Sequence, residues 1–522
     1  MSVKDLFLTE IKETPIQQDV AVSGTLPNWM SGTYYKVGNG KFTLPSGFQM
    51  NHLIDGYCII FQYKIDSNKI RFRSKFLNSD AYKDAIEFGK PTHAEFGTRQ
   101  YAHPNKNMIS RAISSVFPTD LSDNNAGNIF TYRDQIYCNN EGFFLHQIDP
   151  ETLQSVAKLD LRKAEIFATS GHYLQDSTGA IYNSAISAKL GMLKPLIIQF
   201  TAPTTNKSNN SADDNTFDLK NHVKSVATMP LSSMTSLSHS HSFGMSKNYF
   251  VVVHQPFTVN FFSFAAGQIT GKTIMDCMHW DPEGKVKFVV IDRSTGNIVK
   301  TKYHTENFCF IHIVNTYEEN DYLIIDIITY NSPENITCLM LCKLRNSGFN
   351  PNNPGLLKRF VLPIKNFKEA QTKKNLVKMS YTTATAIKVD TDHIVLSSET
   401  PFEVPMDIAR FNEKLIGHKY RFLYSVALFQ KELYKLDTET KEVKMWKSTN
   451  DAHFVGEPLF VPNPEAKNED DGVIISVVAE AGKNNSMLIF LNAVSFSEIA
   501  RAEFNGDVTV GNHGLFVFKK QN

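Results

Sequence analysis

Short runs rich in Val, Ile, Phe and Tyr recur along the whole chain, and they constrain the fold more than any other feature of the sequence. Examples are residues 58–65, 248–257, 286–293, 321–330, 472–481 and 486–494. Turn-forming residues separate them, as in DGY, DPEG, RSTGN and FNGD. Apolar runs of this length between turn signals are typical of antiparallel strands. The pattern predicts an all-β fold.

Helical signals are few and short, and they lie at residues 107–117, 407–417 and 184–193. None is long enough to organise a domain. A strand-rich chain of 522 residues must protect its sheet edges, and a β-propeller does so by circular repetition around a central axis. We therefore expect a single propeller domain over residues 1–522. Residues 206–215 are predicted to form a surface loop and residues 463–472 an acidic turn.

Charge and cysteine usage restrict the partners and the compartment. The 54 Lys and Arg residues nearly balance the 53 Asp and Glu residues, so we expect no nucleic-acid partner. Six cysteines without a CxxC pair, and a charged N-terminus where a signal peptide has an apolar core, predict a cytoplasmic protein. No run approaches the roughly 18–20 apolar residues of a spanning helix. Any membrane contact is therefore expected to be peripheral.

Four of the 16 histidines stand in strand-like or strand-end settings: His172, His241, His312 and His513. The first three are about 70 residues apart and the last follows after about 200, close to three such intervals. This spacing favours one metal ligand on the inner strand of successive blades. A single histidine is more often structural or on the surface, so spacing alone leaves both interpretations open.

Ordered motifs run almost from end to end of the chain. GTLPNWMSGTYYKVGNGKF (24–42) precedes NHLIDGYCIIFQY (51–63) and AEFGT (94–98), and later come FEVP (402–405), GEPLFVPNP (456–464) and NHGLF. Together they resemble the carotenoid cleavage oxygenase family, in particular its animal branch of β-carotene oxygenases and the retinoid isomerase. The resemblance implies a seven-bladed propeller with short helices and loops capping one face over an axial metal site. It also implies one ferrous ion per chain, held by the four histidines, with O2 as co-substrate.

The resemblance further implies three glutamates behind the histidines, pairing Glu141 with His241, Glu403 with His312, and Glu457 with His513. A carboxylate that accepts the outer ring N–H fixes the orientation of the ring and raises its basicity as a ligand. Four neutral imidazoles leave the charge of the metal intact and coordination positions open. The alternative for each glutamate is a solvated strand end or a surface ion pair.

An apolar tunnel is expected to lead to the metal, lined by residues that include Phe96, Asn140, His239, Ile311 and Val404. His239 stands where relatives commonly have tyrosine. The retinoid isomerase has aromatic residues at the positions that match Ile311, Val404 and Asn512, and aromatic faces stabilise a developing cation. Their absence here weakens the isomerase interpretation. Phe96 retains the aromatic residue of the family.

The expected activity is that of a non-haem Fe(II) dioxygenase, which cleaves a conjugated double bond of a carotenoid or apocarotenoid to aldehyde or ketone products such as retinal. Two alternatives stay open: a retinoid isomerohydrolase acting on retinyl esters, and a non-catalytic carotenoid-binding protein. The apolar substrate suggests peripheral membrane contact through residues 189–200, 257–274 and 107–117, which could equally be buried elements. Asn105 replaces a cysteine that relatives could acylate, so a lipid anchor is not expected there.

Overall fold

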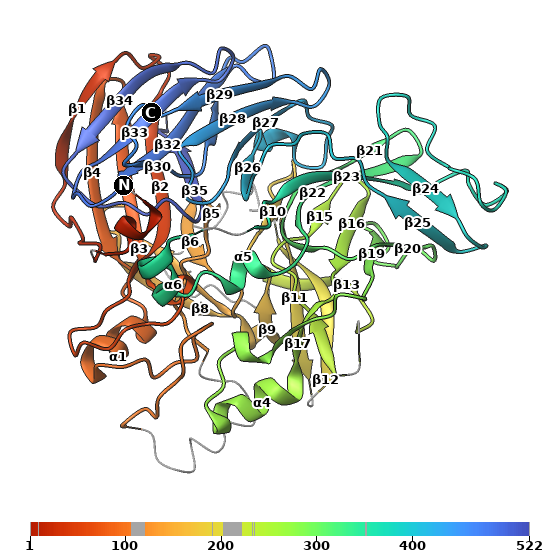
Figure 1. The fold of residues 1–522 in the computed structure, drawn as a ribbon, viewed down its shortest axis with the longest axis horizontal. Helices are drawn as coiled ribbons and strands as arrows, with labels where there is room; N and C mark the ends of the chain where they lie inside the picture. The colour runs from red at the N-terminus through yellow and green to blue at the C-terminus, as the bar shows by residue number, and fades with distance from the viewer. Residues whose placement is uncertain are drawn as a thin grey trace, which may run out of the picture.

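The computed structural model describes residues 2–8, 10–105, 121–189, 192–201, 222–231, 233, 235–349 and 352–520. Within these residues the chain is built mainly of β-strands, which gather into seven sheets (Figure 1). The predicted all-β class is therefore confirmed.

The largest sheet joins the two ends of the chain. Its order is β30-β32-β33-β34-β1-β4-β3-β2-β35, and β31 pairs with β32. Its strands are β1 (Gln18–Gly24), β2 (Ser31–Lys41), β3 (Tyr57–Asp66), β4 (Lys69–Phe76), β30 (His453–Val455), β31 (Leu459–Pro462), β32 (Gly472–Glu480), β33 (Ser486–Asn492), β34 (Glu498–Phe504) and β35 (Gly514–Phe518). Gly32 pairs with Phe518 and Ala21 with Glu503. The red and blue strands in Figure 1 consequently lie together.

Three sheets follow one another along the first half of the chain. One contains β5 (Asn128–Tyr132), β6 (Gln135–Asn139), β7 (Phe144–Ile148) and β8 (Ser155–Asp160). The next contains β9 (Ile166–Thr169), β10 (Leu174–Gln175), β11 (Ile181–Lys189), β12 (Met192–Phe200) and β13 (Val223–Thr228). A small sheet contains β14 (Ser236–Ser238), β17 (Phe257–Asn260) and β18 (Met278–Trp280).

The remaining three sheets lie mostly in the second half. One runs β15 (Gly244–Met245), β16 (Tyr249–His254), β19 (Val286–Asp292), β20 (Lys302–Thr305), β25 (His393–Ser397) and β24 (Thr385–Lys388). Another holds β21 (Cys309–Glu319), β22 (Tyr322–Tyr330) and β23 (Leu356–Pro363). The last holds β26 (Ile408–Arg410), β27 (Phe422–Val426), β28 (Glu432–Asp437) and β29 (Val443–Lys447).

Short helices connect the strands. The α-helices are α1 (Asp80–Phe88), α4 (Phe261–Thr270), α5 (Glu334–Thr337) and α6 (Leu341–Ser347); the 3₁₀ turns are η1 (Val3–Leu6), η2 (Leu53–Asp55), η3 (Leu161–Ala164), η4 (Met275–Cys277) and η5 (Glu413–Leu415). The side chain of Asn260 caps the start of α4, and Gly271 ends it at φ 74°. In Figure 1, α1 and α4 project on the lower side of the sheets. Within the described residues, no helix has the length and apolarity needed to cross a membrane.

The predicted strands are confirmed, whereas two predicted helices are wrong. The six apolar runs fall on β3, β16 with the start of β17, β19, β22, β32 and β33. Residues 407–417 form β26 and η5, because Ile408–Arg410 pair with β27. Residues 184–189 lie in β11 and residues 192–193 in β12, since ladder pairing overrides the weak local preference of Ala and Ser. Residues 463–472 turn between β31 and β32. Predictions for 107–117 and 206–215 lie outside the described residues.

Candidate metal centre

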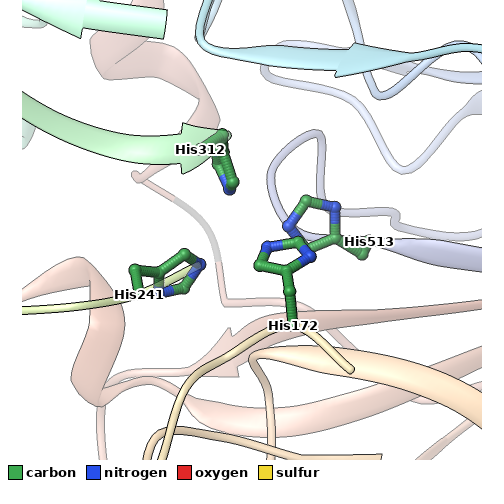
Figure 2. A group of neighbouring side chains, drawn as sticks. All are labelled: His172, His241, His312 and His513. Carbon is green, nitrogen blue, oxygen red and sulfur yellow. The ribbon is translucent and has the colours of Figure 1, made fainter. Parts of the chain in front are cut away.

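The four histidines singled out in the sequence meet at one point (Figure 2). One nitrogen from each of His172, His241, His312 and His513 lies within 4.8 Å of the others. The ring centroids given for five of the six pairs are 4.5 to 5.2 Å apart. Figure 2 shows the rings turned toward a common centre from four separate segments.

Each histidine lies in a strand or shortly before one, and the four strands belong to different sheets. His172 lies just before β10, His241 just before β15, and His513 immediately before β35. His312 lies within β21, where the pairing with β22 shifts register between Phe310 and Ile313. A register shift of this kind re-aims a side chain that regular pleating would send elsewhere.

Gly171 allows two of these histidines to approach each other. Its backbone N–H donates to the carbonyl of His241 at 2.8 Å. A Cβ atom at position 171 would lie 2.6 Å from Cε1 of the His241 ring. Any side chain here would therefore displace His241, so the glycine is required by the close approach itself.

Two carboxylates hold histidine rings from behind. His241 Nδ1 hydrogen-bonds to Glu141 Oε1. His513 Nδ1 donates to Glu457 Oε1 at 2.7 Å, and the backbone N–H of Gly514 donates to Glu457 Oε2 at 2.7 Å. These are the pairs that the family resemblance implies, and each leaves Nε2 of its histidine facing the shared centre.

His312 is held differently from the expectation. Its Nδ1 donates to the backbone carbonyl of Asp407 at 2.8 Å, while Glu403 is exposed. The expected Glu403–His312 pair is not formed, because the carbonyl that precedes β26 occupies the position behind the ring. The Asp407 carboxylate is anchored in turn by Tyr330 Oη at 2.6 Å and by the N–H of Leu428 at 2.7 Å.

His172 has no carboxylate partner among the described contacts, as the resemblance implies. Its Nδ1 lies 3.5 Å from Nδ2 of Asn128, at the limit of a hydrogen bond. The Asn128 amide also donates to the carbonyl of Gly171 at 3.3 Å.

Electrostatics keep most of the rings neutral. Burial, reinforced by the neighbouring histidines, holds the pKa of His172 and of His312 well below the usual value. Burial also lowers the pKa of His513, although Glu457 opposes it. Neutral imidazole is the form that binds metal ions. The cluster is thus electronically ready to act as a ligand set.

Unpartnered nitrogens indicate what the cluster is built to hold. Nε2 of His172 and Nε2 of His312 are buried without a hydrogen-bond partner. Buried polar atoms almost always have a partner, and an ion is one of the partners that satisfies them. Imidazole suits iron, zinc, copper and nickel. The four residues present therefore fit a divalent transition metal.

Arg410 supports the site, and the sequence did not single it out. Its Nη1 lies 3.6 Å from Glu457 Oε1, and its Nη2 lies 2.7 Å from Glu413 Oε1. Burial alone would raise the pKa of Glu457, but Arg410 and His513 outweigh it and lower the pKa to about 2. The buried carboxylate thus stays charged. Arg410 was missed because residues 407–417 were predicted to form a helix, and nothing in that segment marks Arg410 as a neighbour of Glu457.

His239, which replaces the usual tyrosine, contacts the same glutamate as His241. Its Nε2 lies 3.3 Å from Glu141 Oε2. Burial lowers the pKa of His239, but Glu141 outweighs it and raises the pKa. His239 and His241 hold the pKa of Glu141 well below its usual value, although the carboxylate is partly exposed. Glu141 is therefore an ionised carboxylate shared by two histidines.

Three of the other predicted tunnel residues pack together, and Asn140 lies apart from them. Phe96, Ile311 and Val404 are half-buried and pack against one common hydrophobic cluster. Asn140 precedes Glu141, and its Nδ2 donates to the carbonyl of Asn124 at 3.2 Å. Asn512 donates from Nδ2 to Asn39 Oδ1 at 3.0 Å and to the carbonyl of Ala126 at 2.5 Å, so it braces the turn before His513.

A model of the family described as retinal pigment epithelial membrane protein matches residues 8–518, nearly the whole chain. The chain belongs to the carotenoid cleavage oxygenase family. It is 34% identical over 510 residues to the rat β,β-carotene 15,15'-dioxygenase, covering 95% of this chain and 88% of the relative. It is 28% identical over 533 residues to the human mitochondrial carotenoid-cleaving dioxygenase, covering 98% of this chain and 90% of the relative.

Solved structures of carotenoid oxygenases share the fold. A variant of the Synechocystis apocarotenoid oxygenase superposes with a TM-score of 0.76 at 19% identity, covering 99% of both chains. The cobalt-substituted form of that oxygenase gives a TM-score of 0.75 at 20% identity with the same coverage. The likeness at this identity establishes the architecture of this carotenoid oxygenase homologue.

Proposed function

We propose that this protein is a non-haem Fe(II) dioxygenase that cleaves a conjugated double bond of a carotenoid or apocarotenoid and gives aldehyde or ketone products such as retinal. The observation that carries the proposal is the convergence of four histidine nitrogens within 4.8 Å. The rat relative named as a β,β-carotene dioxygenase, at 34% identity over most of the chain, supports the substrate class.

One ferrous ion per chain is the proposed cofactor, and it would supply the chemistry with O2, the proposed co-substrate. The chain's own residues hold and orient the four histidine rings. Glu141 and Glu457 fix two rings, the Asp407 carbonyl fixes a third, and Arg410 keeps Glu457 charged. No side chain is needed as a general acid or base in this proposal.

We assign substrate selection to the apolar residues beside the four histidines. Phe96, Ile311 and Val404 pack on one hydrophobic cluster, and Ile311 directly precedes the proposed ligand His312. An apolar wall beside the metal suits a polyene, which offers no polar group for recognition. Asn140 and His239 would line the same path near Glu141.

The fold is proposed to be one seven-bladed propeller domain over residues 1–522. The succession of mainly antiparallel sheets along the chain supports it. Both chain ends pair in one sheet, and this pairing would close the circle of blades. The short helices and loops would cap one face over the metal.

Peripheral membrane contact is proposed through α4 and the β11–β12 hairpin. Met192 is 70% exposed, and the exposed Lys194 and Lys272 flank these segments as interfacial lysines do. Changing Met192 and Phe264 together to Glu should reduce sedimentation with phospholipid vesicles. The matched control is Met445→Glu on β29, which is also exposed and should bind vesicles normally. Equal binding by all forms would contradict this surface.

A cytoplasmic location is proposed as well. The six cysteines are free thiols, which is the usual state in a reducing compartment.

The retinyl-ester isomerohydrolase is the second candidate, and Ile311, Val404 and Asn512 disfavour it because none offers an aromatic face to a cation. Incubation of the iron-loaded protein with a panel of carotenoids and retinyl esters under ¹⁸O₂ distinguishes the two. We expect the label in an aldehyde product from a carotenoid. An unlabelled retinol product from a retinyl ester would overturn the proposal.

A carotenoid-binding protein without turnover is the third possibility. His241→Ala is the informative variant, since it removes one proposed ligand without touching the apolar residues. We expect pigment binding to persist and product formation to stop. If the parent protein binds carotenoid but forms no product under any metal loading, the oxygenase proposal fails.

A further inference from the structure

The strand that carries His312 is longer than the strand it pairs with, and part of the excess lies at this histidine. β21 has 11 residues, whereas β22 has 9. The pairing shifts register between Phe310 and Ile313, on either side of His312. An extra residue in a strand leaves backbone groups without ladder partners, so other groups must hold the strand in this shape. We call residues 310–313 the His312 bulge.

One buried glutamine binds the backbone at the start of the His312 bulge. Gln255 lies in the connection between β16 and β17 and is 2% exposed. Its Oε1 accepts from the N–H of Phe310 at 2.9 Å, and its Nε2 donates to the carbonyl of Phe310 at 3.0 Å. The side-chain amide thus binds both backbone groups of Phe310, as a neighbouring strand would.

The same glutamine also binds the segment that precedes His241. Its Nε2 donates to the carbonyl of His239 at 2.9 Å. Gln255 therefore holds His239 and Phe310 together, and each of these lies two residues before a proposed metal ligand. A side-chain amide has two N–H donors and one acceptor oxygen, and all are used here. A methionine at this position would lack them.

Ser242, the residue after His241, binds the backbone on both sides of His312. Its hydroxyl donates to the carbonyl of Ile311 at 2.7 Å and accepts from the N–H of Ile313 at 2.8 Å. Ser242 is buried. Loss of its hydroxyl would leave two backbone groups of the His312 bulge without these partners.

A close approach of β15 to β21 accompanies these hydrogen bonds. A Cβ atom at Gly244, on β15, would lie 2.2 Å from Thr316 Oγ1, on β21. Glycine at position 244 consequently allows the segment that follows His241 to lie directly against the strand of His312.

We infer that Gln255 and Ser242 are positioning residues that fasten the His312 bulge to the segment of His241 and so set the spacing of these two metal ligands. The inference rests on the proposed metal site. Both residues act through backbone groups rather than on the metal itself. Ligands that are already held at the right spacing bind a metal more tightly, because less conformational freedom is lost on binding.

The test compares two buried glutamines. Gln255→Met keeps a side chain of similar length and removes its hydrogen bonds. Gln62→Met is the matched control, because Gln62 on β3 is also buried and also makes three hydrogen bonds, with Tyr35, Pro150 and Arg73. We expect both variants to lower the thermal midpoint of the metal-free protein. Only Gln255→Met should weaken Co²⁺ binding, by about 10- to 100-fold, and change the visible absorption of the bound ion.

A smaller change keeps the test decisive if Gln255→Met does not fold. Ser242→Ala removes one oxygen atom and should weaken Co²⁺ binding by about tenfold. Ser242→Thr retains the hydroxyl and should bind Co²⁺ more tightly than Ser242→Ala. Ser74→Ala is the matched control, since Ser74 on β4 is also buried and its hydroxyl accepts from the backbone N–H of Thr14 at 2.9 Å. This control should bind Co²⁺ as the parent protein does.

Two negative outcomes are distinguishable. If the parent binds Co²⁺ and either Gln255→Met or Ser242→Ala keeps its affinity and spectrum, the inference is wrong and the metal site stands. The same holds if Gln62→Met or Ser74→Ala weakens binding as much as its counterpart, because the loss would then be general. If the parent binds no Co²⁺, the proposed metal site fails and the inference fails with it.

Discussion

The outer ring nitrogens of the histidines are held by acceptors of unequal strength. Glu141 and Glu457 are carboxylates, whereas His312 has only the backbone carbonyl of Asp407. A carboxylate raises the basicity of its histidine more than a carbonyl does, and such partners typically contribute about 10- to 100-fold in metal affinity. The two carboxylate-backed rings should therefore account for most of the affinity that the surroundings add.

Substitution of the three predicted glutamates tests this assignment. Glu141→Gln and Glu457→Gln should each weaken Co²⁺ binding by about 10- to 100-fold. Glu403→Gln should bind within about twofold of the parent, since Glu403 is exposed and His312 uses a carbonyl. Equilibrium titration of the metal-free variants with Co²⁺ measures each affinity. A loss in Glu403→Gln equal to that of the other two would show that Glu403 does back His312.

Gly171→Ala should disturb the metal centre without unfolding the protein. The new Cβ would meet the tip of the His241 ring at 2.6 Å, and a ring tip yields more easily than backbone. We expect metal affinity to fall at least tenfold while the thermal midpoint of the metal-free protein changes little. Gly511→Ala is the control, because its Cβ would meet only Leu428 Cδ1 at 3.8 Å. Unchanged affinity in Gly171→Ala would contradict the packing argument.

At the residue scale the sequence predicted the four histidines and the Glu141 and Glu457 pairs as the structure places them, because they lie inside ordered family motifs. It could not predict the partner of His312. That partner is a backbone carbonyl, which every residue carries, so only the course of the chain before β26 determines which one reaches the ring. Arg410 was missed for a related reason, since its role depends on a contact with Glu457 far along the chain.

At the scale of elements, α1 is tied to the sheets by one buried carboxylate. Asp123 accepts from the N–H groups of Asp80 at 3.0 Å and Ala81 at 2.8 Å, at the start of the helix. It also lies 3.2 Å from His146 Nε2 and 3.2 Å from Lys158 Nζ. Burial would raise the pKa of Asp123, but His146 and Lys158 outweigh it and hold the pKa far below its usual value.

The sign of the pH dependence follows from that depressed pKa. Asp123 contributes stability that is fully present above the pKa of an unfolded aspartate, about 4, and that is lost as the pH falls below it. Urea unfolding at pH 7 and at pH 3 should show the parent losing more stability than Asp123→Asn. If the free energy of unfolding falls by the same amount in both proteins between pH 7 and pH 3, Asp123 does not contribute in this way.

The β22–β23 pair depends on a buried ion pair. Arg359 donates from Nε and Nη2 to the two carboxylate oxygens of Asp326, both at 2.8 Å, and Tyr420 Oη donates to Asp326 at 2.6 Å. Arg359→Met should destabilise the fold by about 3–5 kcal/mol, because it leaves a buried carboxylate uncompensated. The double variant Arg359→Met/Asp326→Leu should recover much of that loss. Denaturant unfolding measures the stability of all three proteins. A double variant less stable than Arg359→Met would contradict this account.

The long buried strands were predicted correctly and two short strand segments were not, for physical reasons. Long β-branched runs such as β22 and β32 are buried over most of their length, and their composition alone favours strands. The segments 184–193 and 407–417 contain Ala, Ser, Leu and charged residues, which suit a helix locally. Their strand pairing comes from partners in the hairpin and in β27, which a local pattern does not report.

At the scale of the whole molecule, the two chain ends share one sheet, and His513 precedes the strand that completes it. β35 pairs with β2, so the position of the fourth histidine depends on a contact between residues nearly the full chain length apart. The spacing of the first three histidines suggested a repeat, but the sequence could not establish which strands bring the two chain ends together. Removal of β35 should abolish metal binding, because it removes the pairing with β2 that positions His513.

The most direct test of the central claim is the metal content and X-ray absorption spectrum of the iron-loaded protein, compared with four variants in which His172, His241, His312 or His513 is changed to alanine. We predict one iron per chain with four imidazole nitrogens in the parent protein, and loss of tight binding in every variant. A variant that retains full iron with an unchanged spectrum would show that its histidine is not a ligand and would contradict the account.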